Sequence, residues 1–171
     1  MRPAIFLDRD GTLNRNCPYC KNEDEIVLYQ DIFGPLAELS KTHYIVIITN
    51  QSGVARGYFT IDDLERMHAK IRREIKAHGG RIDAIYYCID LPEAASRMRK
   101  PNTGMVEKAL RDFDILAKAS FVVGDEDADM LLARNLGMRA IRVRNRQGKY
   151  MGDFYADDFN EVLEIIRNEE A

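Results

Sequence analysis

The sequence contains no tryptophan and only three cysteines, three histidines and five prolines in 171 residues. Three cysteines are too few for a disulfide framework, so reduced or metal-bound thiols in a reducing compartment are expected. No apolar run approaches the roughly 18–20 residues of a membrane-spanning helix, and the N-terminus lacks the apolar core of a secretory signal. These absences argue against a disulfide-rich secreted protein or a membrane protein and favour the cytoplasm.

An excess of charge of one sign is also absent. The 25 basic and 28 acidic residues give a formal net charge of −3, which provides no electrostatic sign of a nucleic-acid or membrane partner. Hydrophobic residues make up 46% of the chain, an ordinary value for a globular protein. The length fits one domain, residues 1–171, with a core of its own. We expect a monomer or a small homo-oligomer.

Short apolar runs alternate with amphipathic helical patterns, with no internal repeat or linker between them. The strands that we expect are Ala4–Leu7, Tyr44–Ile48, Ala84–Ile89, Phe121–Val123 and Ala140–Val143. The expected helices are Ile32–Leu39, a helix from Thr60 to Gly79, one near Met105–Phe113, Asp127–Leu136 and Phe159–Ile166. The strands are continuously apolar, which is typical of strands covered by helices on both faces. This pattern predicts an α/β fold with a parallel sheet.

Polar residues stand where the expected strands end. Asp8 and Asp10 follow the first strand, and residues two apart on extended backbone face the same way, so both carboxylates can address one point. The carboxyl ends of parallel strands lie at one edge, where open α/β sheets bind ligands. The residues that this edge would bring together are Asp8, Asp10, Thr49, Asn50, Lys100 and Asp125.

These residue types suit the hydrolysis of a phosphomonoester. Asp8 can act as a nucleophile that forms an aspartyl-phosphate, and Asp10 can protonate the leaving oxygen and later deprotonate water. Thr49 and Lys100 can bind the phosphoryl oxygens, and Lys100 would keep Asp8 ionised. The Asp8 and Asp125 carboxylates and a backbone carbonyl are hard oxygen ligands of the kind that Mg²⁺ prefers.

Simpler interpretations exist for each residue alone. Asp8 or Asp125 could be a helix cap, and a lone Lys100 is most often a solvated surface charge. Asp127 and Asp129 suit the first turn of a helix, although Asp129 could support the metal from behind its ligands. The three histidines are scattered, which favours surface or partly buried positions over catalysis. The ordered occurrence of several such residues at strand ends favours a shared site.

The motifs resemble those of the haloacid dehalogenase superfamily of phosphatases. DRDGT at residues 8–12, Thr49, Lys100 and GDEDAD at residues 124–129 match the four motifs of that superfamily in order. The segments TNQSGVARGYF at residues 49–59 and RKPNTGM at residues 99–105 resemble those of heptose bisphosphate and histidinol-phosphate phosphatases. Polynucleotide 3′-phosphatases, which process nucleic-acid ends, are more distant relatives of the same pattern.

The resemblance implies a Rossmann-like three-layer sandwich with sheet order 3-2-1-4-5 and no large cap domain. It implies that Asp8 is the nucleophile and Asp10 the general acid and base. It places Mg²⁺ on Asp8, the Asp10 carbonyl and Asp125. It assigns phosphoryl binding to Thr49 and Lys100 and places four further residues in the substrate region: Asn50, Gln51, Ser52 and Arg99. The implied substrate is a small phosphorylated metabolite, first a heptose phosphate or bisphosphate and second histidinol phosphate.

The sequence departs from these relatives in two places. Relatives often carry a zinc-binding loop, and of its cysteine and histidine ligands only Cys88 is present in this chain. Two hypotheses follow: a relocated structural zinc site of Cys17, Cys20 and Cys88, with Asp90 as a further ligand, or three unbound thiols. Glu126 stands where relatives often carry a basic residue. Its charge would repel a second phosphate and argues against a bisphosphate substrate.

Overall fold

The fold is built on one sheet of six parallel strands in a computed structural model that describes residues 1–171. The order of the strands across the sheet is β3-β2-β1-β4-β5-β6. The strands are β1 (Ala4–Leu7), β2 (Tyr44–Asn50), β3 (Ala84–Cys88), β4 (Phe121–Gly124), β5 (Arg139–Val143) and β6 (Phe154–Ala156). Leu7 pairs with Ile47 of β2 and with Val123 of β4, so the residues that follow these positions meet at one edge.

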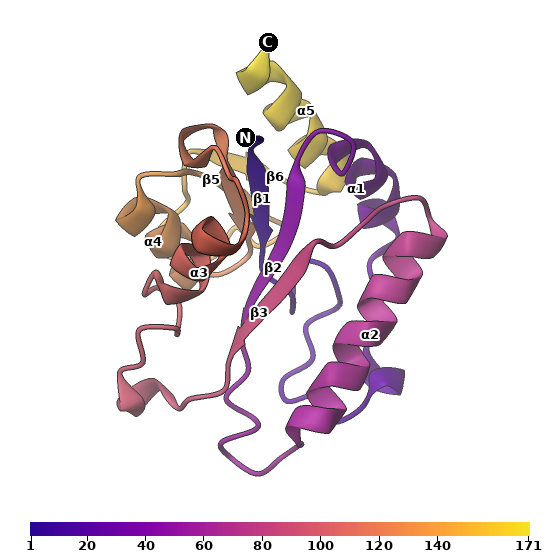
Figure 1. The fold of residues 1–171 in the computed structure, drawn as a ribbon, viewed down its shortest axis with the longest axis vertical. Helices are drawn as coiled ribbons and strands as arrows, with labels where there is room; N and C mark the ends of the chain where they lie inside the picture. The colour runs from indigo at the N-terminus through magenta and orange to yellow at the C-terminus, as the bar shows by residue number, and fades with distance from the viewer.

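Five α-helices cover the two faces of this sheet (Figure 1). They are α1 (Phe33–Leu39), α2 (Ile61–Ala77), α3 (Gly104–Asp112), α4 (Asp127–Leu136) and α5 (Phe159–Glu170). Short 3₁₀ turns occupy Glu23–Glu25, Gln30–Ile32, Pro92–Ala94 and Ala117–Ala119. In Figure 1, α1, α2 and α5 lie on one side of the strands, and α3 and α4 lie on the other.

Alternate residues of the central strand enter the two cores. Ile5 and Leu7 belong to the cluster that includes the buried side chains of α1, α2 and α5, whereas Ala4 and Phe6 belong to the cluster with α3 and α4. All four residues are fully buried. Successive side chains of a strand point to opposite faces, so a strand buried on both faces must be apolar throughout. The continuous apolar runs of the sequence therefore follow from the three-layer architecture.

The predicted α/β class, the parallel sheet and the order of its first five strands are confirmed. The sequence did not reveal β6, because three residues after a polar loop carry too little pattern to indicate a strand. Thr60 and Asp63, whose spacing in the sequence is typical of a capping box, form one at the start of α2. The helical spacing of apolar residues in the sequence also predicts a buried Ile61 in that helix, which is wrong because 44% of Ile61 is exposed.

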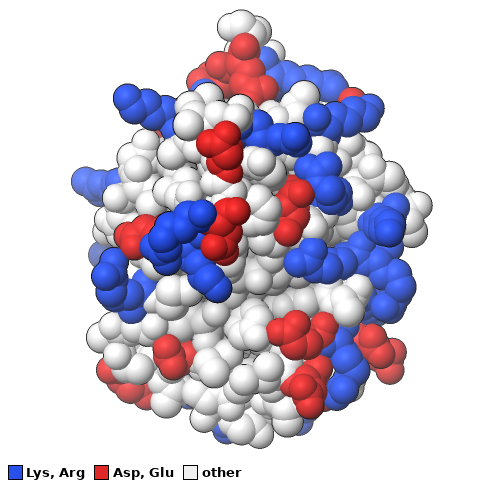
Figure 2. All heavy atoms as spheres, viewed as in Figure 1, with Lys and Arg blue, Asp and Glu red and all other residues white.

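The lengths of the helices and the charges on one face of the molecule can be compared with the sequence. None of the helices is both long and apolar enough to cross a membrane. Figure 2 shows basic and acidic side chains both distributed over the face that it presents. This distribution agrees with the small net charge of the whole chain.

Candidate active site

The carboxyl ends of the neighbouring strands β1, β2 and β4 surround a polar hollow of about 180 Å³. Eight of the nine residues that line it are polar or charged, as expected for a site that binds an anion or a metal. They are Asp8, Asp10, Asn16, Thr49, Asn50, Lys100, Glu126, Ala128 and Asp129. The hollow therefore brings together Asp8, Asp10, Thr49, Asn50 and Lys100, which the sequence analysis had placed at one sheet edge.

Lys100 is the buried cation of this site. Its Nζ donates to Asp8 Oδ1 at 2.7 Å, to Asp129 Oδ1 at 2.8 Å and to the Ile48 carbonyl at 3.0 Å. Burial lowers the pKa of Lys100, but the Asp129 and Asp8 carboxylates together raise this pKa above its ordinary value. Lys100 is therefore a charged, fixed group and not the solvated surface charge of the simpler interpretation.

Asp129 has a larger part in the site than its position in a first helical turn suggests. It is 1% exposed, and besides its ion pair with Lys100 it accepts the Glu126 backbone N–H at 3.2 Å. Burial, and next the charge of Asp8, raises the pKa of Asp129 to about 7. The side chain thus caps α4 and holds the ammonium of Lys100 at the same time.

Asp125 follows β4 and completes a cluster of three buried carboxylates with Asp8 and Asp129. One carboxylate oxygen of each lies within 4.8 Å of the others. Burial, and next the neighbouring charge of Asp8, raises the pKa of Asp125 to about 9. Thr12 Oγ1 donates to Asp125 Oδ1 at 3.1 Å, a contact that the sequence analysis did not foresee. Three acids against one ammonium leave the cluster short of positive charge.

Gly11 makes room for Asp125. Its φ is +80°, and a Cβ on it would collide with the Asp125 carboxylate. We expect Gly11→Ala to lower the free energy of unfolding by about 1–3 kcal/mol and to reduce activity by displacing Asp125. Gly137→Ala is the matched control, because its φ is +65° but a Cβ there meets open space. Denaturant unfolding and initial rates of both variants measure the two losses. Equal activity of the Gly11→Ala and Gly137→Ala proteins would contradict the role of Gly11.

Asp10 is held by side-chain amides from two segments. Asn14 Nδ2 donates to its Oδ1 at 2.9 Å, and Gln51 Nε2 donates to its Oδ2 at 3.0 Å. The same Gln51 nitrogen donates to Thr49 Oγ1 at 2.8 Å. Because Thr49 accepts this hydrogen bond, its own hydroxyl hydrogen is left to point at an anion in the hollow.

Asn50 fixes the backbone from which Lys100 extends. Its Oδ1 accepts the Lys100 N–H at 3.0 Å, and its Nδ2 donates to the Lys100 carbonyl at 3.2 Å. This reciprocal pair links the end of β2 to the loop after β3. Asn50 therefore both lines the hollow and sets the place of the buried cation.

Three of the predicted substrate residues do not line the hollow: Gln51, Ser52 and Arg99. Gln51 is 5% exposed and lies behind Asp10 and Thr49, which it orients. Arg99 Nη1 donates to the Asp90 carbonyl at 3.2 Å. Two residues that do line the hollow, Asn16 and Glu126, were not among the predicted substrate residues.

The relocated zinc site is not formed. Cys17 and Cys20 are joined in a disulfide, whereas Cys88 is a free, buried thiol at the end of β3. Its Sγ lies 3.7 Å from Asp90 Oδ2. The disulfide leaves no thiolate, the ligand that zinc requires from cysteine, and the three sulfur atoms do not converge. The expectation of reduced thiols is also wrong for Cys17 and Cys20.

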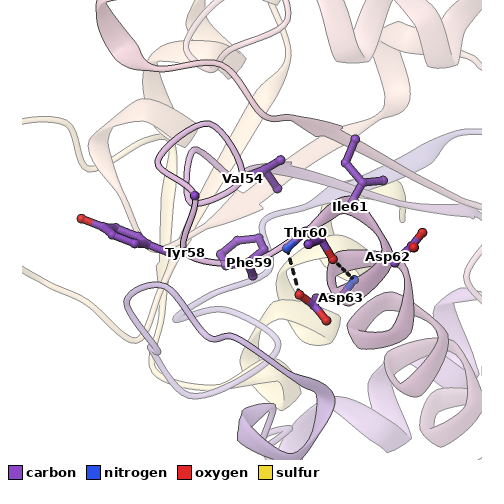
Figure 3. A pocket seen from close by; sticks show the side chains of 8 residues that line it. Val54, Tyr58, Phe59, Thr60, Ile61, Asp62 and Asp63 are labelled. Carbon is purple, nitrogen blue, oxygen red and sulfur yellow. Dashed lines mark hydrogen bonds between the residues drawn. The ribbon is translucent and has the colours of Figure 1, made fainter.

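A larger hollow of about 600 Å³ lies beside the loop after β2 and shares no lining residue with the candidate site (Figure 3). The Thr60 backbone N–H and hydroxyl pair with Asp63, as the dashed lines of Figure 3 show. These groups cap α2, and Tyr58 points away from the rest of the lining. Nothing in it matches the convergent carboxylates of the smaller hollow.

Comparisons with known proteins agree with this geometry. A HAD-hydrolase-like family model matches residues 97–162. A D-glycero-D-manno-heptose-1,7-bisphosphate 7-phosphatase of Thermosynechococcus vestitus is 34% identical over an alignment of 187 positions, which covers 96% of this chain and 95% of that protein. A D-glycero-beta-D-manno-heptose-1,7-bisphosphate 7-phosphatase of Helicobacter pylori is 30% identical, with 96% and 97% covered.

A solved structure extends the likeness to the fold. The D,D-heptose 1,7-bisphosphate phosphatase from B. bronchiseptica, complexed with magnesium and phosphate, has a TM-score of 0.88 and 30% identity, with 99% of each chain covered. Identity and coverage of this size, together with the four motifs at the strand ends, show the family. The chain belongs to the heptose-bisphosphate phosphatases of the haloacid dehalogenase superfamily.

Proposed function

We propose that this chain is a Mg²⁺-dependent phosphomonoesterase that hydrolyses a sugar phosphate, first of all a heptose bisphosphate, through a phosphorylated Asp8. The observation that carries this proposal is the buried Asp8 carboxylate, paired with Lys100 Nζ at 2.7 Å and next to the acids Asp125 and Asp129. The names of the relatives at 30–34% identity support the same substrate class.

In the first step the Asp8 carboxylate attacks phosphorus. Lys100 holds its Oδ1, so Oδ2 is the attacking oxygen. As the new bond forms, the bond from phosphorus to the sugar oxygen breaks, and Asp10 gives this oxygen its proton. The Thr49 hydroxyl and the Lys100 ammonium neutralise charge on the phosphoryl oxygens during the transfer.

In the second step Asp10 accepts a proton, whereas in the first step it donates one. Its carboxylate takes a proton from a water molecule, whose oxygen attacks the phosphorus held on Asp8. The bond between Asp8 and phosphorus breaks, which releases phosphate and restores the free carboxylate. Because the Asn14 and Gln51 amides fix Asp10, the same carboxyl group can serve both steps from one place.

The residues present fit a magnesium ion. Asp8 and Asp125 offer buried carboxylate oxygens, and the nearby cluster holds three acids against the single ammonium of Lys100. Oxygen donors of this kind suit a hard divalent cation, and we assign the Asp8 and Asp125 carboxylates and the Asp10 carbonyl as its ligands. When bound, the ion lowers the repulsion between the anionic nucleophile and the anionic substrate.

A substitution of Glu126 tests whether this residue faces the second phosphate of a bisphosphate substrate. It is exposed and lines the hollow, so its charge opposes a further anionic group. Glu126→Gln keeps the shape and should raise kcat/KM for a sugar bisphosphate, relative to the monophosphate, about 2- to 5-fold at low salt. Glu164→Gln, at an exposed position of α5, is the control. An unchanged ratio of the two kcat/KM values would mean that Glu126 does not face the second phosphate.

A substrate panel tests the proposed function as a whole. The panel contains D-glycero-D-manno-heptose 1,7-bisphosphate, histidinol phosphate and a 3′-phosphorylated oligonucleotide, each assayed with Mg²⁺ and with excess chelator. We expect the highest kcat/KM for the heptose bisphosphate and no turnover with the chelator. A preference for histidinol phosphate or for the oligonucleotide would contradict the proposed substrate, and undiminished rates with the chelator would contradict the metal.

A further inference from the structure

Arg9, the residue between the two catalytic aspartates, carries a fully buried guanidinium. It is 1% exposed, and its only salt bridge is with Asp10. Nε and Nη2 donate to Asp10 Oδ1 at 3.1 and 2.9 Å, and Nη2 also lies 3.1 Å from Oδ2. Removing a guanidinium from water is unfavourable, so an apolar side chain would fill this space at a lower cost in stability if filling space were the only need.

His68 of α2 holds the other end of this guanidinium. Its Nε2 lies 3.2 Å from Arg9 Nη1, and the ring is 3% exposed, contrary to the surface or partly buried position that we expected for the histidines. Burial, and next the charge of Arg9, lowers the pKa of His68 to about 3. The imidazole is therefore neutral near pH 7, and its Nε2 accepts the hydrogen bond from Arg9.

The backbone of Arg9 is fixed as firmly as its side chain. Its carbonyl accepts the N–H groups of Thr12 at 3.2 Å, Leu13 at 2.8 Å and Asn14 at 3.3 Å. The turn after β1 thus closes on Arg9, while the guanidinium reaches back to Asp10. Neither Arg9 nor His68 lines the hollow, so both act on the reaction only through another residue.

We propose that Arg9 and His68 are positioning residues: His68 orients the guanidinium of Arg9, which in turn holds the Asp10 carboxyl group in place for proton transfer. This inference rests on the proposed role of Asp10. It links the first half of α2 to proton delivery at the sheet edge. A misplaced proton donor matters most when the leaving group needs its proton, as a sugar alkoxide does and a nitrophenolate does not.

The test compares two leaving groups and two substitutions. We expect His68→Leu to lower kcat/KM for heptose 1,7-bisphosphate about 10- to 100-fold and for p-nitrophenyl phosphate by much less, because kcat/KM reports the transfer to Asp8. His68→Gln, whose side-chain oxygen can accept from Arg9, should restore most of the lost activity. Arg9→Lys keeps the charge but loses the planar fork, so it should show the same selective loss.

Asp10→Asn separates this inference from the proposed function. In that background His68→Leu should cause no further loss on the heptose bisphosphate, because the group that it positions is already disabled. Equal losses on both substrates, no rescue by glutamine, or an undiminished further loss in the Asp10→Asn background would overturn the positioning role. If His68→Leu does not fold, the ratio of kcat/KM for the heptose bisphosphate to kcat/KM for p-nitrophenyl phosphate is compared in the other two variants. This ratio should fall in Arg9→Lys and stay near the wild-type value in His68→Gln, and the opposite pattern would overturn the positioning role. A fully active Asp10→Asn variant would instead overturn the proposed role of Asp10.

Discussion

Replacing Asp8 with asparagine should abolish turnover, lowering kcat by about 10⁴-fold or more, because an amide cannot form the phosphorylated intermediate. The substitution keeps the size of the side chain, and Lys100 keeps its second carboxylate partner, Asp129, at 2.8 Å. We therefore expect a folded protein with a thermal midpoint close to that of the wild type. Phosphate release under saturating substrate and Mg²⁺ is the measurement.

Three controls make the Asp8→Asn result decisive. Circular dichroism should show an intact fold, and mass spectrometry should exclude the slow deamidation that would regenerate aspartate. Asn22→Asp, the opposite substitution on the loop after β1, tests the effect of a changed charge outside the hollow. Near-normal turnover by the verified Asp8→Asn protein would refute the assignment of the nucleophile.

Replacing Lys100 with methionine should cost both stability and activity. Removing one member of a buried ion pair leaves the Asp8 and Asp129 carboxylates without their common cation, at a cost of about 3–5 kcal/mol of unfolding free energy. We expect kcat/KM to fall by about 10²- to 10³-fold, as when a donor to the developing charge is removed. Denaturant unfolding and steady-state kinetics measure the two losses.

Lys118→Met is the matched control for Lys100→Met, because Lys118 is an exposed lysine. It should leave stability and kinetics close to those of the wild type. Lys100→Arg should not restore activity, since the three acceptors at 2.7–3.0 Å surround a compact ammonium and not a planar fork. An active and fully stable Lys100→Met protein would contradict the placement of this cation in the site.

The residues nearest to the strands were the ones that the sequence predicted well. Continuous apolar runs indicated parallel strands with helices on both faces, and parallel strands bring their carboxyl ends to one edge. Asp8, Asp10 and Thr49 follow directly from such runs, so their convergence in one hollow needed no knowledge of tertiary contacts. Lys100 lies farther from its strand, in the loop after β3, and the strand-end pattern and the family motif both indicated its place.

Contacts between distant segments were beyond the sequence argument. An exposed acid would suit the first turn of a helix as well as a buried one, so the sequence position of Asp129 did not indicate its surroundings. Only the packing of α4 shows its hydrogen bond with Lys100. A buried arginine is rare, so Arg9 offered no signal until His68 of α2 was seen beside it. The family resemblance placed Gln51 in the substrate region, whereas its amide faces Asp10 and Thr49. Side-chain direction in a loop is set by tertiary packing and not by spacing.

The site of covalent phosphorylation shows most directly whether Asp8 is the nucleophile. Acid quenching during turnover of heptose 1,7-bisphosphate, followed by borohydride reduction and peptide mass spectrometry, converts a phosphorylated aspartate into homoserine. With p-nitrophenyl phosphate, whose leaving group needs no proton, the Asp10→Asn variant should raise the trapped amount, because the base that activates water is then missing. We predict homoserine at Asp8 and at no other residue. Phosphate release without any modified aspartate, or modification at another carboxylate, would contradict the assignment of Asp8 as the nucleophile.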